Sequence, residues 1–214
     1  MLQLDFNNSL TQLLCLGAHS DDIEIGCGGT IIKLISMYPK LKIYWVVLGA
    51  KGKRESEAIA SATDLLSEVE DKQIIVKGFK DGFFPYIGAD IKLYFEELKQ
   101  AVNPDLILTH YQQDLHQDHR VVSELTRNTF RNHLIWEYEI PKYDADLGSP
   151  NILVRLSRDI RQKKIDHLTN HFQTQNNKQW FTEETFNAIL RIRGIESNAP
   201  EKYAEGFYCR KMVF

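Results

Sequence analysis

The stretch that decides the fold is Leu13-Leu14-Cys15-Leu16-Gly17, which is followed directly by Ala18-His19-Ser20-Asp21-Asp22. Its first five residues are apolar without alternation, which is typical of a strand buried on both faces of a parallel sheet. Three further runs share this pattern: Ile43–Leu48, Gln73–Val76 and Asp105–Thr109. We therefore expect four buried strands, each followed by a loop and a helix.

The segments around these runs have apolar residues at helical spacing. They are Gly29–Tyr38, Glu55–Leu66, Asp90–Val102 and, after the fourth strand, Asp118–Phe130. Strands that alternate with helices form βαβ units, so the sequence predicts an α/β fold: a single-domain, Rossmann-like, mostly parallel sheet flanked by helices. For the less regular second half we expect strands at Leu134–Ile140, Ile152–Leu156 and Tyr203–Phe214, and helices at Ser157–Leu168 and Thr182–Ile192.

Length and composition indicate an ordinary globular protein. The 214 residues are 43% hydrophobic and 26% charged, which fits one domain over residues 1–214 with a full core. The net charge of −3 argues against a nucleic-acid binder, and no run approaches the ~20 apolar residues that span a bilayer. The first ten residues lack the basic cluster of a signal peptide, and the three cysteines form no CxxC. We therefore expect reduced thiols and a cytoplasmic location.

Two loops of the predicted sheet concentrate histidines and carboxylates. Ligands of open α/β sheets bind beyond the carboxyl ends of the strands, where loops begin near Ala18, Gly49, Gly78 and His110. The first loop carries one histidine and two aspartates. The fourth has three histidines and two aspartates within ten residues: His110, Asp114, His116, Asp118 and His119. Acidic groups so close together repel one another, so this cluster favours a bound cation.

Two histidines and one carboxylate with an open position form a catalytic zinc site, and a second carboxylate can take the proton of the bound water. Adjacent side chains diverge, so Asp21 and Asp22 divide into one ligand and one base. His116 and His119 share a helix face, where one can bind metal while the other faces the substrate. The alternative is that the aspartates only cap a helix and the histidines are surface residues. Two such clusters at neighbouring strand ends favour the metal site.

These residues resemble the PIG-L (LmbE-like) family of deacetylases. Its two motifs, A-H-P-D-D and H-x-D-H, correspond to Ala18–Asp22, with serine in place of proline, and to His116–His119. Further similarities lie at Thr109-His110, Asp114, Ile140-Pro141, Arg193-Gly194 and Tyr203–Phe207.

The resemblance implies an LmbE-like fold and zinc-dependent removal of an N-acetyl group from a small amino sugar or sugar conjugate. It implies that His19, Asp22 and His119 hold the zinc, although Fe²⁺ and other divalent ions suit the same ligands. It also implies Asp21 as general base and His116 as the group that faces the oxyanion or leaving amine, with Asp118 orienting His116.

Other residues carry weaker indications. Arg54 and Asp81 resemble substrate-contacting residues of the family, and Arg54 would suit an anionic group on the sugar; both equally fit a solvated helix start and a turn. For Glu57 the structural interpretation is favoured. His167 and His171 have metal-binding spacing, but no acidic loop converges on them by sequence, so a second metal site is disfavoured.

Three functions remain open at this stage. They are the deacetylase, a metal-dependent hydratase of an unsaturated carboxylic acid on the same scaffold, and a sugar-binding protein without activity. The deacetylase is favoured because no ligand or base is missing. We expect a small-molecule N-acetylated sugar as partner and neither nucleic acid nor membrane, and the sequence leaves homo-oligomer formation open.

Overall fold

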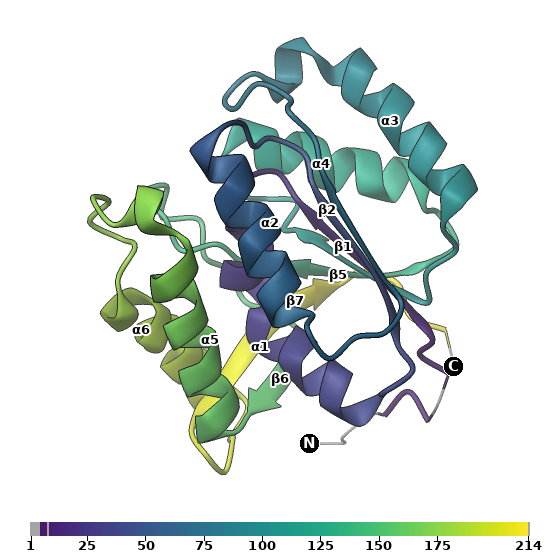
Figure 1. The fold of residues 1–214 in the computed structure, drawn as a ribbon. Coiled ribbons are helices and arrows are strands. Elements are labelled where there is room, and N and C mark those ends of the chain that lie inside the picture. The colour runs from purple at the N-terminus through teal and green to yellow at the C-terminus, as the bar shows by residue number, and fades with distance from the viewer. Residues whose placement is uncertain (1–4, 8, 214) are drawn as a thin grey trace.

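A computed structural model describes residues 5–7 and 9–213. Its centre is a seven-stranded sheet in the order β3-β2-β1-β4-β5-β7-β6 (Figure 1). The strands are β1 (Gln12–Gly17), β2 (Lys42–Val47), β3 (Lys72–Val76), β4 (Leu106–His110), β5 (Leu134–Tyr138), β6 (Ile152–Leu156) and β7 (Tyr203–Cys209). The pairs from β3 to β5 are parallel, whereas β7 runs antiparallel to both of its neighbours. The predicted fold class is thus confirmed.

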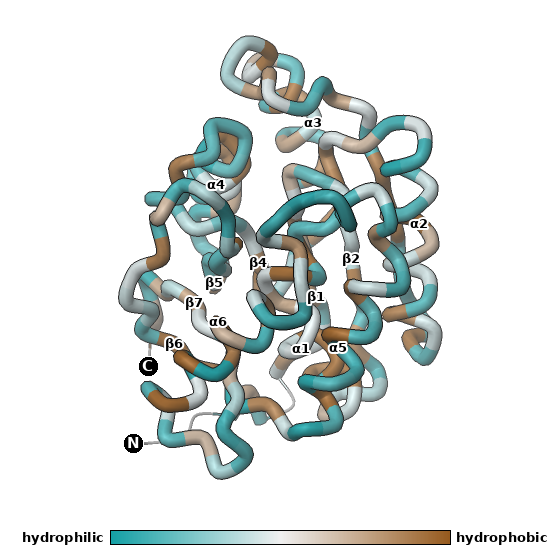
Figure 2. The backbone as a smooth tube through the Cα atoms, turned by 90° about the vertical axis from the view of Figure 1, so that its left-hand side faces the viewer, coloured by the Kyte–Doolittle hydropathy of each residue, from teal (hydrophilic) through white to brown (hydrophobic). Residues whose placement is uncertain are grey.

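Helices cover both faces of the sheet. They are α1 (Asp22–Met37), α2 (Lys53–Leu65), α3 (Gly88–Ala101), α4 (Gln117–Thr129), α5 (Arg158–His171) and α6 (Glu183–Glu196), with short 3₁₀ helices η1 (Phe84–Tyr86) and η2 (Gln173–Gln175). One core cluster joins the sheet to α1 and α2 and continues to α5 and α6, and a second joins its other face to α3 and α4. Figure 2 shows hydrophobic positions between polar ones along α2 and α3, as expected for helices with one face on a sheet.

Helix α1 begins seven residues before the predicted start at Gly29. Its first turn carries Asp22 and Glu24, which made the segment resemble a loop, but residues 22–31 are all buried. A helix that is buried on every side has no amphipathic pattern for the sequence to reveal. Close packing explains its glycines: a Cβ at Gly26 would lie 2.1 Å from the Tyr138 ring. The helix therefore fits between the sheet and α5 only with a small residue there.

The remaining boundaries agree with the sequence to within a few residues. The last strand ends at Cys209, five residues before the predicted end at Phe214, which lies outside the described residues. Cys15, Cys27 and Cys209 are free thiols, as expected. Within the described residues, no helix combines the length and the apolar character needed to cross a membrane.

Candidate metal centre and active site

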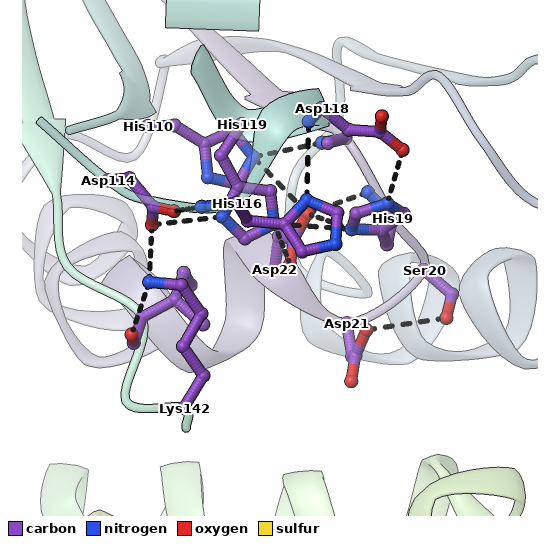
Figure 3. A network of polar contacts seen from close by, with 12 residues as sticks. His19, Ser20, Asp21, Asp22, His110, Asp114, His116, Asp118, His119 and Lys142 are labelled. Atoms are coloured by element: carbon purple, nitrogen blue, oxygen red, sulfur yellow. Dashed lines mark hydrogen bonds and ion pairs between the residues drawn. The ribbon is translucent and has the colours of Figure 1, made fainter. Parts of the chain in front are cut away.

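The two loops rich in histidine and aspartate meet at one edge of the sheet. Strands β1 and β4 are parallel neighbours, so the loop before α1 and the loop before α4 leave the sheet side by side. The N–H of Ala18 donates to Nε2 of His110 over 2.9 Å and ties the two loops together at their base. Figure 3 shows the resulting cluster, in which His19 and Asp22 from one loop face the histidines of the other.

Three side chains bring ligand atoms together in this cluster. Nδ1 of His19 lies 3.2 Å from Nε2 of His119 and 3.4 Å from Oδ2 of Asp22, and Nε2 of His119 lies 3.5 Å from Oδ1 of Asp22. Ligands at the zinc distance of about 2.0–2.1 Å in a tetrahedron are roughly 3.3 Å apart. The Asp22 carboxylate thus approaches each histidine with a different oxygen, and the three side chains are grouped as ligands of one ion, with a donor set that suits a divalent transition metal.

The electrostatics of these groups agree with a cation at this point. Burial and the neighbouring His110 lower the pKa of His119 to about 3, so its imidazole is neutral. Burial opposes ionisation of Asp22, but the surrounding histidines hold the pKa of its carboxyl well below the ordinary value. Burial also disfavours the charged form of His19, yet the carboxylates around it raise its pKa well above the usual range. The pocket thus stabilises positive charge next to an ionised carboxylate.

A carboxylate holds the outer nitrogen of His119. Nδ1 of His119 lies 2.9 Å from Oδ2 of Asp114, whose Oδ1 accepts from the N–H of His116 over 2.8 Å. Nζ of Lys142 lies 2.9 Å from the same Oδ2 and is also paired with Asp146. A carboxylate on the outer nitrogen fixes the tautomer of a histidine and turns its other nitrogen toward the metal. Asp114 therefore presents Nε2 of His119 to the site.

His19 is oriented in the same way. Its Nε2 lies 3.1 Å from Oδ2 of Asp118 and 3.1 Å from Oδ1 of Asp81. Asp118 also accepts from the N–H groups of Gly82 (2.6 Å) and Phe84 (3.1 Å), so it fixes the loop after β3 to the site. The expected pairing of the Asp118 carboxylate with His116 is wrong. Asp118 lies in the first turn of α4, where its side chain contacts His19 while its backbone N–H donates to Nδ1 of His116.

Asp21 and Asp22 diverge as expected for adjacent residues. Figure 3 shows Asp22 among the histidines and Asp21 outside that group, beside Ser20. Burial, together with the charge of Asp22, raises the pKa of Asp21. Arg54 opposes this rise, with its Nη2 3.5 Å from Oδ1 of Asp21. A buried carboxylate with a raised pKa beside a metal centre is suited to accept a proton.

His116 is the partly exposed N-cap residue of α4. Its Nδ1 accepts the N–H of Asp118 over 3.2 Å, so the neutral ring carries its proton on Nε2. Burial and the nearby His19 lower its pKa, which favours that neutral form. The ring centroid lies 4.9 Å from that of His19 and 4.5 Å from that of His119. His116 can thus present an N–H donor beside the metal ligands.

Arg54 is held by protein groups at the rim. Its Nη1 lies 2.6 Å from Oδ2 of Asp81, and its Nε donates to Oγ of Ser20 over 3.2 Å. Ser20 stands where the motif has proline, and its hydroxyl makes a contact that proline could not. Since Arg54 already has carboxylate partners in Asp21 and Asp81, the rim gives little support to the expected anionic group on the substrate.

The sequence missed the positions that support the site from outside. His110, which was noted only as part of the cluster, has Nε2 3.2 Å from Asp22 and a ring stacked on His119 at 3.9 Å. No sequence pattern singled out Lys142, because it lies 28 residues beyond Asp114, the site residue that it contacts. Glu57 accepts from the backbone N–H of Thr174 over 2.9 Å, in agreement with the structural interpretation favoured for it.

A comparison with protein families decides the relationship of the chain. The family model of PIG-L, described as GlcNAc-PI de-N-acetylase, matches residues 14–130, which is more than half of the chain and includes both motifs. The chain belongs to the PIG-L family. The relationship expected from the two motifs is thereby confirmed, and the matched segment contains every proposed ligand of the metal centre.

Solved structures with 15–21% sequence identity share the PIG-L fold of this chain. The N,N'-diacetylchitobiose deacetylase from Pyrococcus horikoshii is 21% identical with a TM-score of 0.69, over 97% of this chain and 87% of that chain. The 4-carboxy-2-hydroxymuconate hydratase GalB from Pseudomonas putida KT2440 is 18% identical with a TM-score of 0.71, and the match covers 96% of this chain and 98% of GalB. The zinc-inhibited form of the teicoplanin deacetylase Orf2 is 15% identical with a TM-score of 0.70, and the match covers 93% of this chain and 97% of Orf2.

Proposed function

We propose that this protein is a zinc-dependent hydrolase that removes the N-acetyl group from a small amino sugar or sugar conjugate. The observation that carries the proposal is the convergence of His19 Nδ1, His119 Nε2 and the Asp22 carboxylate within 3.2–3.5 Å of one another. These three residues would hold the zinc. Such an ion polarises an amide carbonyl and lowers the pKa of a bound water.

The protein groups beside the ligands supply the proton transfers. Asp21 takes a proton from the water as the water attacks the acetyl carbonyl, and its raised pKa makes it a stronger base than an exposed aspartate. The Nε2–H of His116 donates to the carbonyl oxygen as negative charge develops there. When the C–N bond breaks, the proton held by Asp21 passes to the leaving nitrogen. Asp118 acts indirectly, by positioning His19.

The rim is suited to the hydroxyl groups of a sugar. Asp81 is half exposed and ionised, since its hydrogen bond with His19 lowers its pKa, and it can accept from hydroxyl donors. Arg54 holds Asp81 and Asp21 in place and offers its remaining N–H groups to the cleft. We assign both residues to substrate binding. The similar deacetylases are named for N,N'-diacetylchitobiose and teicoplanin, which supports an N-acetyl sugar or conjugate as the substrate class.

One observation favours a second candidate. The GalB structure, a hydratase by name, is as similar in fold as the deacetylases, with a TM-score of 0.71. A fold of this kind hosts both reactions, so fold alone does not separate them. The separating feature is the substrate, which is an amide in one case and an unsaturated acid in the other.

The test is product analysis with the zinc-loaded protein. A panel of N-acetyl amino sugars should yield free acetate and primary amine in equal amounts from at least one member, and His119→Ala should lose both the zinc and the activity. If every amide stays intact while an unsaturated dicarboxylate gains water, the protein is a hydratase. If it binds the sugars but changes neither class, it is a binding protein.

A further inference from the structure

A second group of metal-binding side chains lies away from the active site, between α2 and α5. Figure 1 shows these two helices side by side. His167 and His171 are one turn apart near the end of α5, and their ring centroids are 4.3 Å apart. Asp64 comes from the last turn of α2 and approaches both rings. This carboxylate could not be predicted as a partner of the two histidines, because Asp64 precedes His167 by 103 positions in the chain.

The three side chains converge on one point. Oδ2 of Asp64 lies 3.3 Å from Nδ1 of His167 and 3.0 Å from Nε2 of His171, and one atom of each residue lies within 4.8 Å of the others. These separations match the roughly 3.3 Å between ligands in a tetrahedral zinc site. Two histidines at i and i+4 on a helix are a recurring metal-binding pair. The carboxylate from a second helix completes a set of three ligands.

A hydrogen-bonded chain prepares His167 for this role. Its Nε2 lies 2.8 Å from Oγ of Ser61, and the Ser61 hydroxyl in turn donates to Glu24, which is buried. With the Ser61 hydroxyl donating to Glu24, Ser61 can accept from Nε2–H of His167, and in that tautomer the lone pair of the imidazole is on Nδ1. That lone pair faces the carboxylate of Asp64. A cation between two acceptors removes their repulsion, and a donated outer N–H is the usual support of a metal-binding histidine.

We propose that Asp64, His167 and His171 form a second binding site, for a divalent transition ion of the zinc class. Two imidazoles and one carboxylate suit zinc, copper or nickel rather than magnesium or calcium, which prefer oxygen ligands. Leu168 follows His167, where a zinc hydrolase helix of the H-E-x-x-H type carries its glutamate, so we assign metal binding and no catalysis to this site.

The position of the site gives the bound ion a structural consequence. It would join the last turn of α2 to the last turn of α5, and the chain continues from α5 into η2. There Thr174 is held by Glu57, which lies in the first part of α2. An ion would thus fasten the end of α2 to α5, while the first part of α2 is already tied to η2 by hydrogen bonds.

The experiment counts bound metal. The folded protein is dialysed against a small excess of zinc, and zinc per chain is measured by elemental analysis for the wild type, His171→Ala and Asp64→Asn. Asp64 is exposed and His171 partly so, and neither change creates a core cavity. We expect each variant to bind one zinc fewer than the wild type. The matched control is His133→Ala, which removes a histidine outside both groups and should bind as many ions as the wild type.

The expected difference of one ion is independent of the active site. If His19, Asp22 and His119 bind no zinc, the wild type holds one ion and the two variants none. If those three residues do bind zinc, the wild type holds two ions and each of the two variants holds one. Equal zinc content in the wild type, His171→Ala and Asp64→Asn overturns the second site, and so does a loss that His133→Ala shares.

Discussion

Replacing Asp118 by asparagine should weaken zinc binding rather than slow the chemistry directly. Its carboxylate lies 3.1 Å from Nε2 of His19 and also accepts the N–H groups of Gly82 and Phe84. Asparagine has one acceptor oxygen where aspartate has two. If that oxygen stays on the side of His19 and Gly82, the new amide faces the Phe84 N–H, and a buried donor without an acceptor costs about 1–3 kcal/mol of folding stability.

The loss of zinc affinity in each variant depends on how many carboxylates still contact the metal-binding histidine. Loss of a carboxylate behind a metal-bound histidine lowers metal affinity by about 10–100-fold. His19 retains Asp81 at 3.1 Å, so for Asp118→Asn we expect the lower end, about tenfold or roughly 1.4 kcal/mol. His119 has Asp114 as its only carboxylate at Nδ1 among the described residues, so for Asp114→Asn we expect about 100-fold.

Competition with a chelator of known zinc affinity measures both values, with denaturant unfolding alongside. The matched control is Asp90→Asn, in the first turn of α3, which should leave zinc affinity unchanged. A wild-type zinc affinity in Asp118→Asn, combined with a lower turnover rate at full zinc occupancy, would refute the reasoning. That result would mean that Asp118 acts through His116 after all.

Three further predictions follow from the same geometry. Asp21→Asn should keep its zinc by elemental analysis yet lose about 10²–10⁴-fold in turnover; loss of the zinc would make this residue a ligand. His116→Ala should keep zinc and substrate affinity while kcat falls, and an unchanged kcat would leave the residue a purely structural role. Gly26→Ala should lower stability by about 1–3 kcal/mol in thermal unfolding, because its methyl group would meet the Tyr138 ring. Gly88→Ala, where a Cβ meets nothing within 4 Å, should be neutral or stabilising, and equal losses in the two would contradict the packing argument.

The sheet and the grouping of the proposed metal ligands could be predicted from the sequence, because both depend on local patterns. The apolar runs around Leu13–Gly17 and Ile43–Leu48 have no interpretation as surface loops, and parallel strands place their following loops at one edge. That rule alone brings His19 and His119, 100 positions apart, to the same place, where the structure has their nitrogens at 3.2 Å. The start of α1 was missed for the opposite reason, since its burial on all sides removes the periodic signal.

The contacts that orient the ligands could not be predicted, because they depend on side-chain direction across the cleft. Asp118 lies two residues from His116 in sequence, which made the pair plausible, but Cβ atoms two apart on a helix do not face each other. The structure turns the carboxylate toward His19 instead. Asp64 and Lys142 likewise gain their roles from segments far away in the chain. The residues nearest to Asp64 in the sequence give no sign of the histidines that it meets, and those nearest to Lys142 give no sign of its contact with Asp114.

The groups around the proposed metal centre also explain why the adjacent aspartates are suited to the different roles that we propose for them. The carboxylate of Asp22 accepts the N–H of His19 over 2.6 Å and lies between three histidines, so it is fixed and ionised. Asp21 is buried beside the charge of Asp22, and these two effects raise its pKa although Arg54 lies 3.5 Å away and opposes them. A ligand must stay ionised and rigid, whereas a base must accept and release a proton. One backbone step separates the two environments, so a single turn at the end of β1 would provide both of the proposed functions.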